Sequence, residues 1–341
     1  MFTDNFAKAS LAQLPTVLEL LPNLSKCLNG PNIWIKRDDC TGLALGGNKA
    51  RQLEYYLGHA IAQGADTILT TGAIQSNHVR MSVAAARKLG LDVEVLLEHR
   101  VSGRKTEYYQ SGNPFLIALM GAKIHYFEDG EDEDGADNKL FELADKLRKQ
   151  GKKPYVIPLS ENYTPYGSLG YVDCAAELLQ QCKKLSFKAD AIILPTGSAS
   201  THAGMLCGIR ALGFDIPVLG VCIRRERKAQ AQRVLNKAHQ VAQMIGFKGI
   251  IDDKDIWVDD EMLAPGYGQL NQPALEAIDL LAQTEGILLD PTYTGKAMAC
   301  LIDLVKTKKY TKDQNIVFLH TGGSPALFGY PEILDDDFFQ H

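Results

Sequence analysis

Short apolar runs alternate with longer amphipathic segments along most of the chain. The runs are rich in isoleucine, valine and leucine, which predicts strands that are buried on both faces. The segments between them repeat apolar residues at helical spacing, which predicts helices that cover the strands. The pattern therefore indicates an α/β protein with open twisted, mainly parallel sheets flanked by helices.

The limits of these elements follow from the same pattern. The predicted strands are 33–37, 67–71, 93–97, 123–127, 154–157, 191–194, 218–222, 287–289 and 315–320. The predicted helices are 48–63, 77–89, 113–120, 139–150, 166–182, 201–212, 229–245, 271–285 and 295–306. The acidic stretch 128–137 is predicted to be a solvated loop before the next helix.

Composition narrows the classes of function. The chain has 341 residues, of which 45% are hydrophobic and 23% charged, and its formal net charge is −5. This length is enough for two domains, and the scattered basic residues indicate neither a nucleic-acid partner nor a membrane partner. The seven cysteines include no CxxC pair, which favours reduced thiols in the cytoplasm over disulfides or a metal site. Neither a signal peptide nor a membrane-spanning run is expected.

A lysine behind two glycines is the first candidate for chemistry. Lys49 follows Gly46 and Gly47, between the predicted strand 33–37 and the predicted helix 48–63. Glycines let the backbone turn sharply and approach a bound group closely, so this junction can direct Lys49 towards a ligand. For a lysine taken alone, a solvated side chain in the first helical turn is the simpler interpretation.

The strand exit at 71–78 carries donors for a carboxylate. Ligand sites in parallel sheets lie beyond the carboxyl ends of the strands, and here Gly72 is followed by Ser76, Asn77 and His78 at the start of a helix. Ser76 or Asn77 is a natural helix cap, and that role alone could explain either residue. The free amides of a helix N-terminus also bind carboxylates, and these side chains add further donors.

The stretch 194–201 follows another strand with small and hydroxylated residues. Successive backbone N–H groups can converge on an anion there, and the hydroxyl groups add donors, so the stretch predicts a phosphate site. Its residues are Thr196, Gly197, Ser198, Ala199, Ser200 and Thr201. The stretch matches neither GxGxxG nor the Walker A motif, and a plain helix cap is the alternative.

Three more hydroxyl groups are expected at the same edge. Tyr267 and Tyr293 each lie in a turn rich in glycine or proline, where no sequence neighbour packs against the ring. Thr321 follows the last predicted strand. A lysine amine, a phosphate site and several donors together suit pyridoxal phosphate and a small amino-acid substrate.

Five motifs in order carry a family resemblance. They are GGNKAR (46–51), QSNH (75–78), TGSASTHAG (196–204), APGYG (264–268) and DPTYTGKAM (290–298). Together they resemble the D-cysteine desulfhydrase and 1-aminocyclopropane-1-carboxylate deaminase family, which has the tryptophan-synthase-β-like fold, or fold type II, of pyridoxal-phosphate enzymes. The likeness runs from about residue 14 to residue 331.

The resemblance implies a division of the chain and a role for each candidate residue. The larger, cofactor-binding domain would be discontinuous, comprising 1–49 and 158–341, and a smaller domain would comprise 50–157. The family is expected to form homodimers. In the implied site Lys49 forms the Schiff base and residues 196–201 hold the cofactor phosphate. Asn77 bonds the ring hydroxyl, and Thr321 faces the pyridine nitrogen. The substrate carboxylate is bound by Ser76, Asn77 and His78, and the substrate side of the ring is lined by Tyr267 and Tyr293.

Two positions favour one branch of the family. The deaminases carry a glutamate directly after the second tyrosine and a leucine in the His-x-Gly-Gly exit, whereas this chain has Thr294 and Thr321. A threonine leaves the ring nitrogen nearly neutral, which still suffices for elimination of a good leaving group. The expected reaction converts D-cysteine to pyruvate, hydrogen sulfide and ammonia, with Lys49 removing the Cα proton. The handedness of the substrate rests on the resemblance.

One loop departs from the family and keeps alternatives open. Where the desulfhydrases usually have glycine and serine, residues 159–167 include Glu161 and Tyr163. If this loop borders the site, it changes the size and charge of the site. Deamination of 1-aminocyclopropane-1-carboxylate and loss of sulfite from cysteate are therefore alternatives, although a glutamate disfavours a sulfonate. A pyridoxal-phosphate-binding regulatory protein is the non-enzymatic alternative.

Overall fold

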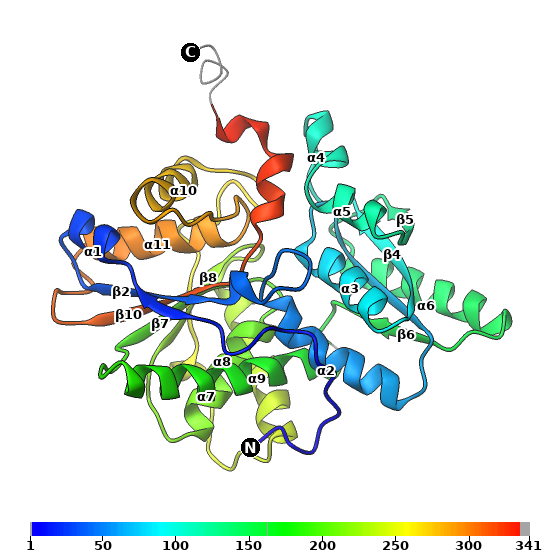
Figure 1. Ribbon diagram of the computed structural model, residues 1–341, viewed down its shortest axis with the longest axis horizontal. Helices are drawn as coiled ribbons and strands as arrows, with labels where there is room; N and C mark the ends of the chain where they lie inside the picture. The colour runs from blue at the N-terminus through cyan, green and yellow to red at the C-terminus, as the bar shows by residue number, and fades with distance from the viewer. Residues whose placement is uncertain (1, 162, 335–341) are drawn as a thin grey trace.

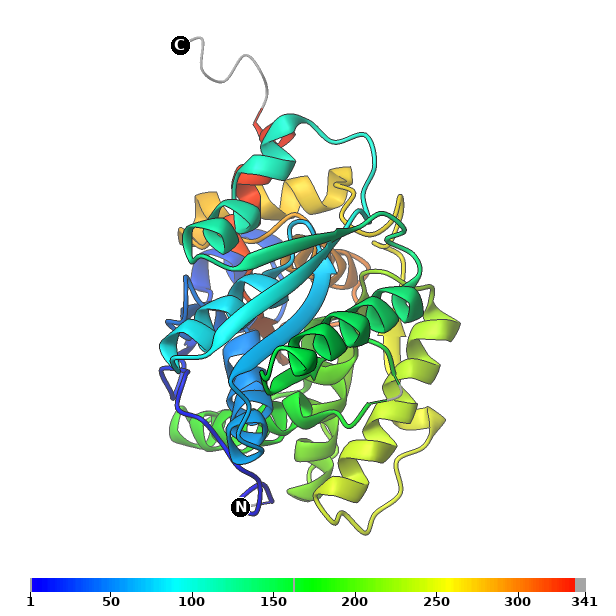
Figure 2. The same ribbon diagram turned by 90° about the vertical axis from the view of Figure 1, so that its right-hand side faces the viewer.

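Two sheets with helices on their faces make up the computed structural model, which describes residues 2–161 and 163–334. The six-stranded sheet has the order β1-β2-β10-β7-β8-β9, and the four-stranded sheet has the order β5-β4-β3-β6. Figure 1 shows the larger sheet and its helices on the left and the smaller ones on the right, and Figure 2 views the smaller sheet from the front. The predicted α/β class with mainly parallel sheets is confirmed.

The bounds of the elements are as follows. The strands are β1 Leu18–Leu20, β2 Asn32–Arg37, β3 Thr67–Ala73, β4 Asp92–Glu98, β5 Lys123–Phe127, β6 Pro154–Ile157, β7 Ala191–Thr196, β8 Val218–Cys222, β9 Trp257–Asp259 and β10 Asn315–His320. The helices are α1 Pro22–Leu28, α2 Lys49–Ala62, α3 Asn77–Lys88, α4 Thr106–Gln110, α5 Asn113–Leu119, α6 Glu133–Lys149, α7 Leu169–Lys184, α8 Ser200–Ala211, α9 Arg227–Met244, α10 Gln272–Glu285 and α11 Thr294–Lys306.

The strand predicted at 287–289 is wrong. Ile287 and Leu289 are buried in the apolar layer beneath α10 and α11, but they pair with no strand among the described residues. Their hydrophobicity reflects packing and not a place in the sheet. Three residues that the sequence pattern did not reveal, 257–259, form the edge strand β9, which pairs with β8. The antiparallel strand β1 on the other edge was also missed.

The loop predicted at 128–137 is wrong in its second half, because α6 begins at Glu133. Asp132 caps this helix, and its carboxylate accepts a hydrogen bond of 2.8 Å from the backbone N–H of Gly135. Acidic residues in the first turn also suit the helix dipole. The acidic composition therefore marked a helix start and not a solvated loop.

Apolar layers cover both faces of each sheet, which explains why the strands are continuously hydrophobic. On the larger sheet, α7, α8 and α9 pack on one face, and α1, α10 and α11 pack on the other. On the smaller sheet, α6 covers one face while α2, α3 and α5 lie on the opposite side. Within the described residues no helix is both long and apolar enough to cross a membrane.

The smaller sheet is built from residues 67–157 alone, whereas the larger takes strands from 18–37 and from 191–320. This arrangement agrees with an inserted small domain. The limits given above, 1–49 with 158–341 and 50–157, remain a proposal.

Candidate active site

A pocket lies between the two sheets, where the carboxyl ends of β2, β3, β7 and β10 lead into loops. It brings together all the residues that the sequence singled out for cofactor or substrate. These are Lys49, Ser76, Asn77, His78, Thr196, Gly197, Ser198, Ala199, Ser200, Thr201, Tyr267, Tyr293 and Thr321. Glu161 does not line this pocket, although its neighbours Ser160 and Tyr163 do.

Lys49 is the first residue of α2, and its amine points into the pocket. The amine donates a hydrogen bond of 3.2 Å to Oε1 of Gln52, and burial lowers the pKa of Lys49 to about 8. Gly47, two residues before Lys49, has φ +133°. A Cβ at this position would lie 3.2 Å from the carbonyl oxygen of Thr321 and 3.0 Å from Sδ of Met81. Glycine therefore lets the chain pass close enough to the last strand to present the amine.

Gln52 connects this lysine to the predicted phosphate loop, and the sequence interpretation missed it. Its Nε2 donates to Oγ1 of Thr201 at 2.9 Å, and Nδ2 of Asn48 donates to the same oxygen at 2.9 Å. Because two donors occupy the lone pairs of this hydroxyl, its own proton is available to a group in the pocket. The spacing of three residues from Lys49 on one helix was the available signal.

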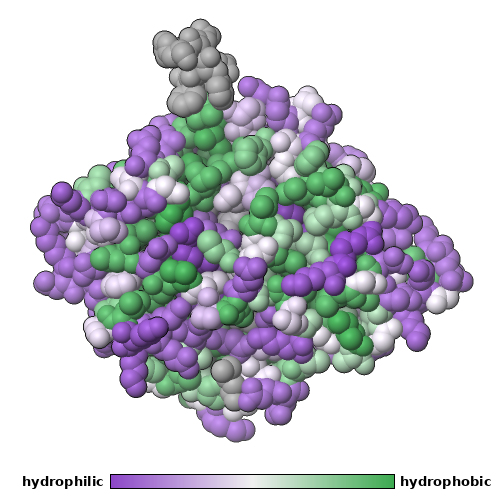
Figure 3. Space-filling model, in the orientation of Figure 1, coloured by the Kyte–Doolittle hydropathy of each residue, from purple (hydrophilic) through white to green (hydrophobic). Residues whose placement is uncertain are grey.

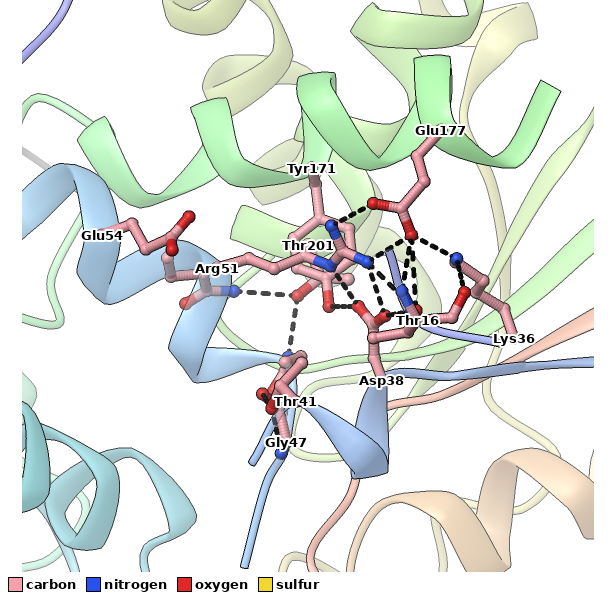
Figure 4. A network of polar contacts seen from close by, with 12 residues as sticks. Thr16, Lys36, Asp38, Thr41, Gly47, Arg51, Glu54, Tyr171, Glu177 and Thr201 are labelled. Atoms are coloured by element: carbon pink, nitrogen blue, oxygen red, sulfur yellow. Dashed lines mark hydrogen bonds and ion pairs between the residues drawn. The ribbon is translucent and has the colours of Figure 1, made fainter. Parts of the chain in front are cut away.

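A buried ionic network behind the site holds α2 in place (Figure 4). The guanidinium of Arg51 donates to Asp38 at 2.9 and 3.0 Å and to Glu177 at 2.9 and 3.0 Å. Lys36 also pairs with Glu177, and the hydroxyl of Tyr171 donates to Asp38 at 2.6 Å. The first turn of α2 is thereby fixed to β2 and to α7.

The start of α3 supplies neutral hydrogen-bonding groups. Ser76 is the N-cap, and its Oγ accepts from the backbone N–H of Val79 at 3.2 Å, so the capping role is real. Oδ1 of Asn77 accepts from Nδ2 of Asn113 at 2.9 Å, which orients the amide so that its NH₂ group can donate elsewhere. Burial, together with the charge of Lys49, lowers the pKa of His78 to about 3, so this imidazole is neutral at pH 7.

The loop 196–201 has the backbone shape of an anion site. Ala199 adopts a left-handed conformation with φ 67°, and α8 begins directly after it without a side-chain cap among the described residues. The N–H groups of the first turn of α8 are therefore free to bind an anion. Nε2 of Gln230 fixes the loop from behind, donating to Oγ1 of Thr196 at 3.0 Å and to the carbonyl oxygen of Gly197 at 3.2 Å.

The two tyrosines share a hydrogen bond across the pocket. Their hydroxyl oxygens are 2.8 Å apart, and their rings meet edge to face at 6.0 Å between centroids. Burial raises the pKa of both phenols, so both keep their protons at neutral pH. Lys296 positions the loop of Tyr267 by donating to the carbonyl oxygens of Leu263 at 2.8 Å and Gly266 at 2.9 Å.

The two branch-marking threonines have different surroundings. Thr321 lines the pocket, and its carbonyl oxygen accepts a hydrogen bond of 3.0 Å from the backbone N–H of Asn48. Thr294 is fully buried and is not among the described residues that line the pocket. Its hydroxyl donates to Asp290 at 2.7 Å, so it fixes the turn before α11. Of the two positions, Thr321 is therefore the one that borders the pocket.

Comparison with known proteins decides the family. A family model described as "Pyridoxal-phosphate dependent enzyme" matches residues 9–322. The chain belongs to the pyridoxal-phosphate-dependent enzymes.

The relatives of this pyridoxal-phosphate-dependent enzyme agree with the resemblance seen in the motifs. D-cysteine desulfhydrase of Salmonella paratyphi C is 43% identical over 325 residues, which cover 95% of this chain and 96% of the relative. The enzyme of Salmonella typhi is 42% identical over the same shares. Among solved structures, an ACC deaminase homologue matches with a TM-score of 0.86 and 34% identity over 98% of both chains.

A more distant match shows the fold alone. The structure of O-ureido-L-serine synthase has a TM-score of 0.67 at 16% identity, and the match covers 95% of this chain and 96% of the other. Two sheets in this arrangement therefore occur in proteins whose sequences differ widely from that of this pyridoxal-phosphate-dependent enzyme.

The residues of the pocket fit pyridoxal phosphate. A desolvated lysine amine is suited to a Schiff base, because its lowered pKa makes the neutral, nucleophilic form accessible near pH 8. The uncapped start of α8 and the hydroxyl of Thr201 offer donors to a phosphate on the neighbouring side of the same pocket. These two features are the ones that the cofactor requires.

Proposed function

We propose that this protein catalyses the β-elimination of D-cysteine to pyruvate, hydrogen sulfide and ammonia. The supporting observation is the combination, in one pocket, of a buried lysine amine, an anion-binding loop and a hydrogen-bonded tyrosine pair. The relatives named D-cysteine desulfhydrase, which match nearly the whole chain, support the choice of substrate.

In this proposal the cofactor supplies an electron sink for the electrons left at Cα. The amine of Lys49 removes the Cα proton, for which its pKa near 8 is well matched. Ser76, Asn77 and the first amides of α3 hold the substrate carboxylate, with neutral His78 beside them. The carboxylate is thereby bound by donors that do not compete with Lys49 for a proton.

The tyrosine pair acts on the leaving group. The hydroxyls of Tyr267 and Tyr293 share one hydrogen bond, so the second proton can be donated to the sulfur as the Cβ–S bond breaks. Asn77, the loop 196–201 and Thr321 are assigned to the ring hydroxyl, the phosphate and the ring nitrogen of the cofactor. A hydroxyl at the ring nitrogen leaves that atom largely unprotonated, which is adequate for elimination.

Replacement of the lysine tests the proposal. Lys49→Ala should abolish pyruvate formation from D-cysteine and the visible absorbance of the lysine-bound cofactor, because Lys49 is the buried pocket amine that lies next to Ser76, Asn77 and the loop 196–201. Lys139→Ala, which removes an exposed lysine from α6, should change neither property. Near-normal turnover by Lys49→Ala would refute the assignment.

Deamination of 1-aminocyclopropane-1-carboxylate is the second candidate, and the structural match to an ACC deaminase homologue favours it. Parallel assays of pyruvate from D-cysteine and of 2-oxobutanoate from the cyclopropane on the wild-type protein separate the two. We expect pyruvate alone, because Thr321 borders the pocket where the deaminases have leucine. A protein that binds the cofactor but converts neither substrate would instead fit a regulatory role.

A homodimer in the cytoplasm belongs to the same proposal. Exposed apolar side chains gather on α5 and on the neighbouring 3-10 helix η4 (Ser324–Gly329), where Figure 3 shows hydrophobic surface. Phe115, Leu119 and Phe328 are each more than half exposed there, and such a patch suits a subunit interface. The seven unpaired cysteines agree with a reducing compartment. Light scattering on wild type and on Leu119→Asp tests the dimer.

A further inference from the structure

Helix α9 directs a strip of polar side chains towards the pocket. Gln230, Arg233 and Lys237 recur at helical spacing and line or adjoin the pocket, with exposures of 0%, 5% and 6%. The buried residues beside them on the same helix, such as Val234 and Val241, are apolar and belong to the core. The strip is therefore not a solvated helix face, and a function must be sought inside the pocket.

These polar groups lack part of their hydrogen bonding. The amine of Lys237 makes no hydrogen bond or ion pair with any residue in the described part of the chain. Nε of Arg233 is a buried donor that has no partner among the residues described. A donor that lost its water without gaining a partner is unfavourable, so these two donors indicate a place where a ligand completes the bonding.

Positive charge exceeds negative charge on this side of the pocket. Both oxygens of Glu133 are occupied by three guanidinium groups, with contacts of 2.7 Å to Arg225 and 3.3 Å to Arg233 and a closer one to Arg224. Glu161 lies 3.9 Å from Arg233 and is partly exposed. Glu131 also lies 3.5 Å from Arg224, so four basic groups face three carboxylates, an excess of one positive charge. The four basic groups are Arg224, Arg225, Arg233 and Lys237.

The subsite is adjacent to the phosphate loop but extends beyond it. Gln230 contacts Thr196 and Gly197, and Arg225 also donates to the carbonyl oxygen of Gly197 at 3.3 Å. Lys237 lies seven residues after Gln230 on α9, which corresponds to about 10 Å along the helix axis. The strip therefore starts at the loop 196–201 and reaches Leu159, whose carbonyl oxygen accepts a hydrogen bond of 2.8 Å from Nη2 of Arg233.

We propose that Arg225, Arg233 and Lys237 form a second anion subsite, which takes an oxyanion group such as a sulfonate, phosphate or carboxylate. The oxyanion has two possible sources, the anionic substituent of a β-substituted amino acid or the cofactor phosphate reaching past the loop. The inference rests on the proposed function, since both sources belong to pyridoxal-phosphate chemistry. Glu161, the glutamate expected to disfavour a sulfonate, lies 3.9 Å from Arg233 and does not line the pocket.

The test uses Lys237→Met with Lys228→Met as the matched control, because Lys228 is an exposed lysine on the same helix. Two constants are measured for each variant: the inhibition constant of D-cysteate against D-cysteine turnover by the holoenzyme, and the dissociation constant of pyridoxal phosphate from the apoenzyme. If the substrate is the source, Lys237→Met raises the inhibition constant about tenfold, a loss of about 1.4 kcal/mol.

If the cofactor is the source, Lys237→Met weakens pyridoxal phosphate binding about tenfold instead, which corresponds to about 1.4 kcal/mol. The subsite is refuted if Lys237→Met matches Lys228→Met in both constants. Should Lys237→Met fail to fold, Lys237→Gln replaces it with the same expected shifts. If wild type forms no pyruvate at all, the proposed function fails separately, and calorimetric binding of inorganic sulfate to wild type and to Lys237→Met then decides the subsite alone.

Discussion

Burial lowers the pKa of the Lys49 amine, and no neighbouring cation is needed to explain the shift. An ordinary lysine has a pKa of about 10.4, whereas burial lowers the pKa of Lys49 to about 8. A buried site without a counter-ion disfavours the charged form. The amine of Lys49 therefore loses its proton at a pH about two units lower than that of a surface lysine. Nucleophilic attack and proton abstraction both require that neutral form.

This gives a pH dependence with a defined sign. The rate at which the apoenzyme captures pyridoxal phosphate should rise with pH through about 8 and then level off, because half of the amine is neutral at its pKa and nearly all of it is neutral at higher pH. Stopped-flow absorbance across pH 6 to 10 measures it, with the exposed lysines of a Lys49→Ala variant as the background. A rate that keeps rising to pH 10 would contradict the lowered pKa.

The tyrosine pair should behave as one acid. Tyr267→Phe and Tyr293→Phe should each lower kcat for D-cysteine by about 10²-fold, the lower range for a general acid, and the double variant should lose little more. 3-Chloro-D-alanine is the control substrate, because chloride departs without a proton. If the variants lose the same factor with both substrates, the tyrosines do not protonate the sulfur.

At the scale of elements, the network around Arg51 ties the first turn of α2 to Asp38, which follows β2, and to Glu177 of α7. Arg51→Met leaves the fully buried Asp38 without its main counter-ion, so we expect a loss of about 3–5 kcal/mol in the free energy of unfolding. Urea unfolding measures the loss. Arg148→Met, which breaks an exposed pair with Asp145 on α6, should cost less than about 1 kcal/mol. Equal losses in the two variants would show that the network is not structural.

Periodicity located most elements because their hydrophobic faces are continuous. The predicted bounds of β5, β6, β8 and β10 agree with the structure, and each of these strands packs between helices or on the core. The strand predicted at 287–289 was wrong because an apolar run that packs without pairing has the same sequence pattern as a strand. The start of α6 was missed because its acidic cap and first turn have the composition of a solvated loop, and because the arginines that pair with Glu133 follow β8, far away in the sequence.

The sequence predicted those site residues that follow a glycine or the end of a strand. It did not predict site residues within helices, whose partners are distant in the sequence. Lys49 and the loop 196–201 stand at loop-to-helix junctions, and the pocket contains both. Gln52, Lys237 and Lys296 are polar residues within helices, a pattern that ordinarily indicates a solvated face. Only the packing of the two sheets shows that all three are buried or nearly so.

At the scale of the whole molecule, Glu133 ties the smaller sheet to the larger one. Glu133 is the first residue of α6. Its carboxylate forms ion pairs with Arg224 and Arg225 from the β8–α9 connection and with Arg233 from α9. Glu133→Gln should therefore speed amide hydrogen exchange in the first turns of α6, because three ion pairs are lost at once. Glu142→Gln, which breaks an exposed pair on the same helix, is the control and should change little. Unchanged protection in Glu133→Gln would contradict the tie.

The position of β10 has a consequence for synthesis on the ribosome. This strand lies between β2 and β7 in the larger sheet, yet residues 38–314 separate it from β2 in the chain. The smaller sheet can close once residue 157 has emerged, whereas the larger sheet keeps a gap with two open edges until the last strand arrives. A nascent chain thus exposes these aggregation-prone edges until β10 has emerged, which is through most of its synthesis. Thr321 follows β10 directly, so the pocket is completed in the same step, and unfinished chains carry no working site.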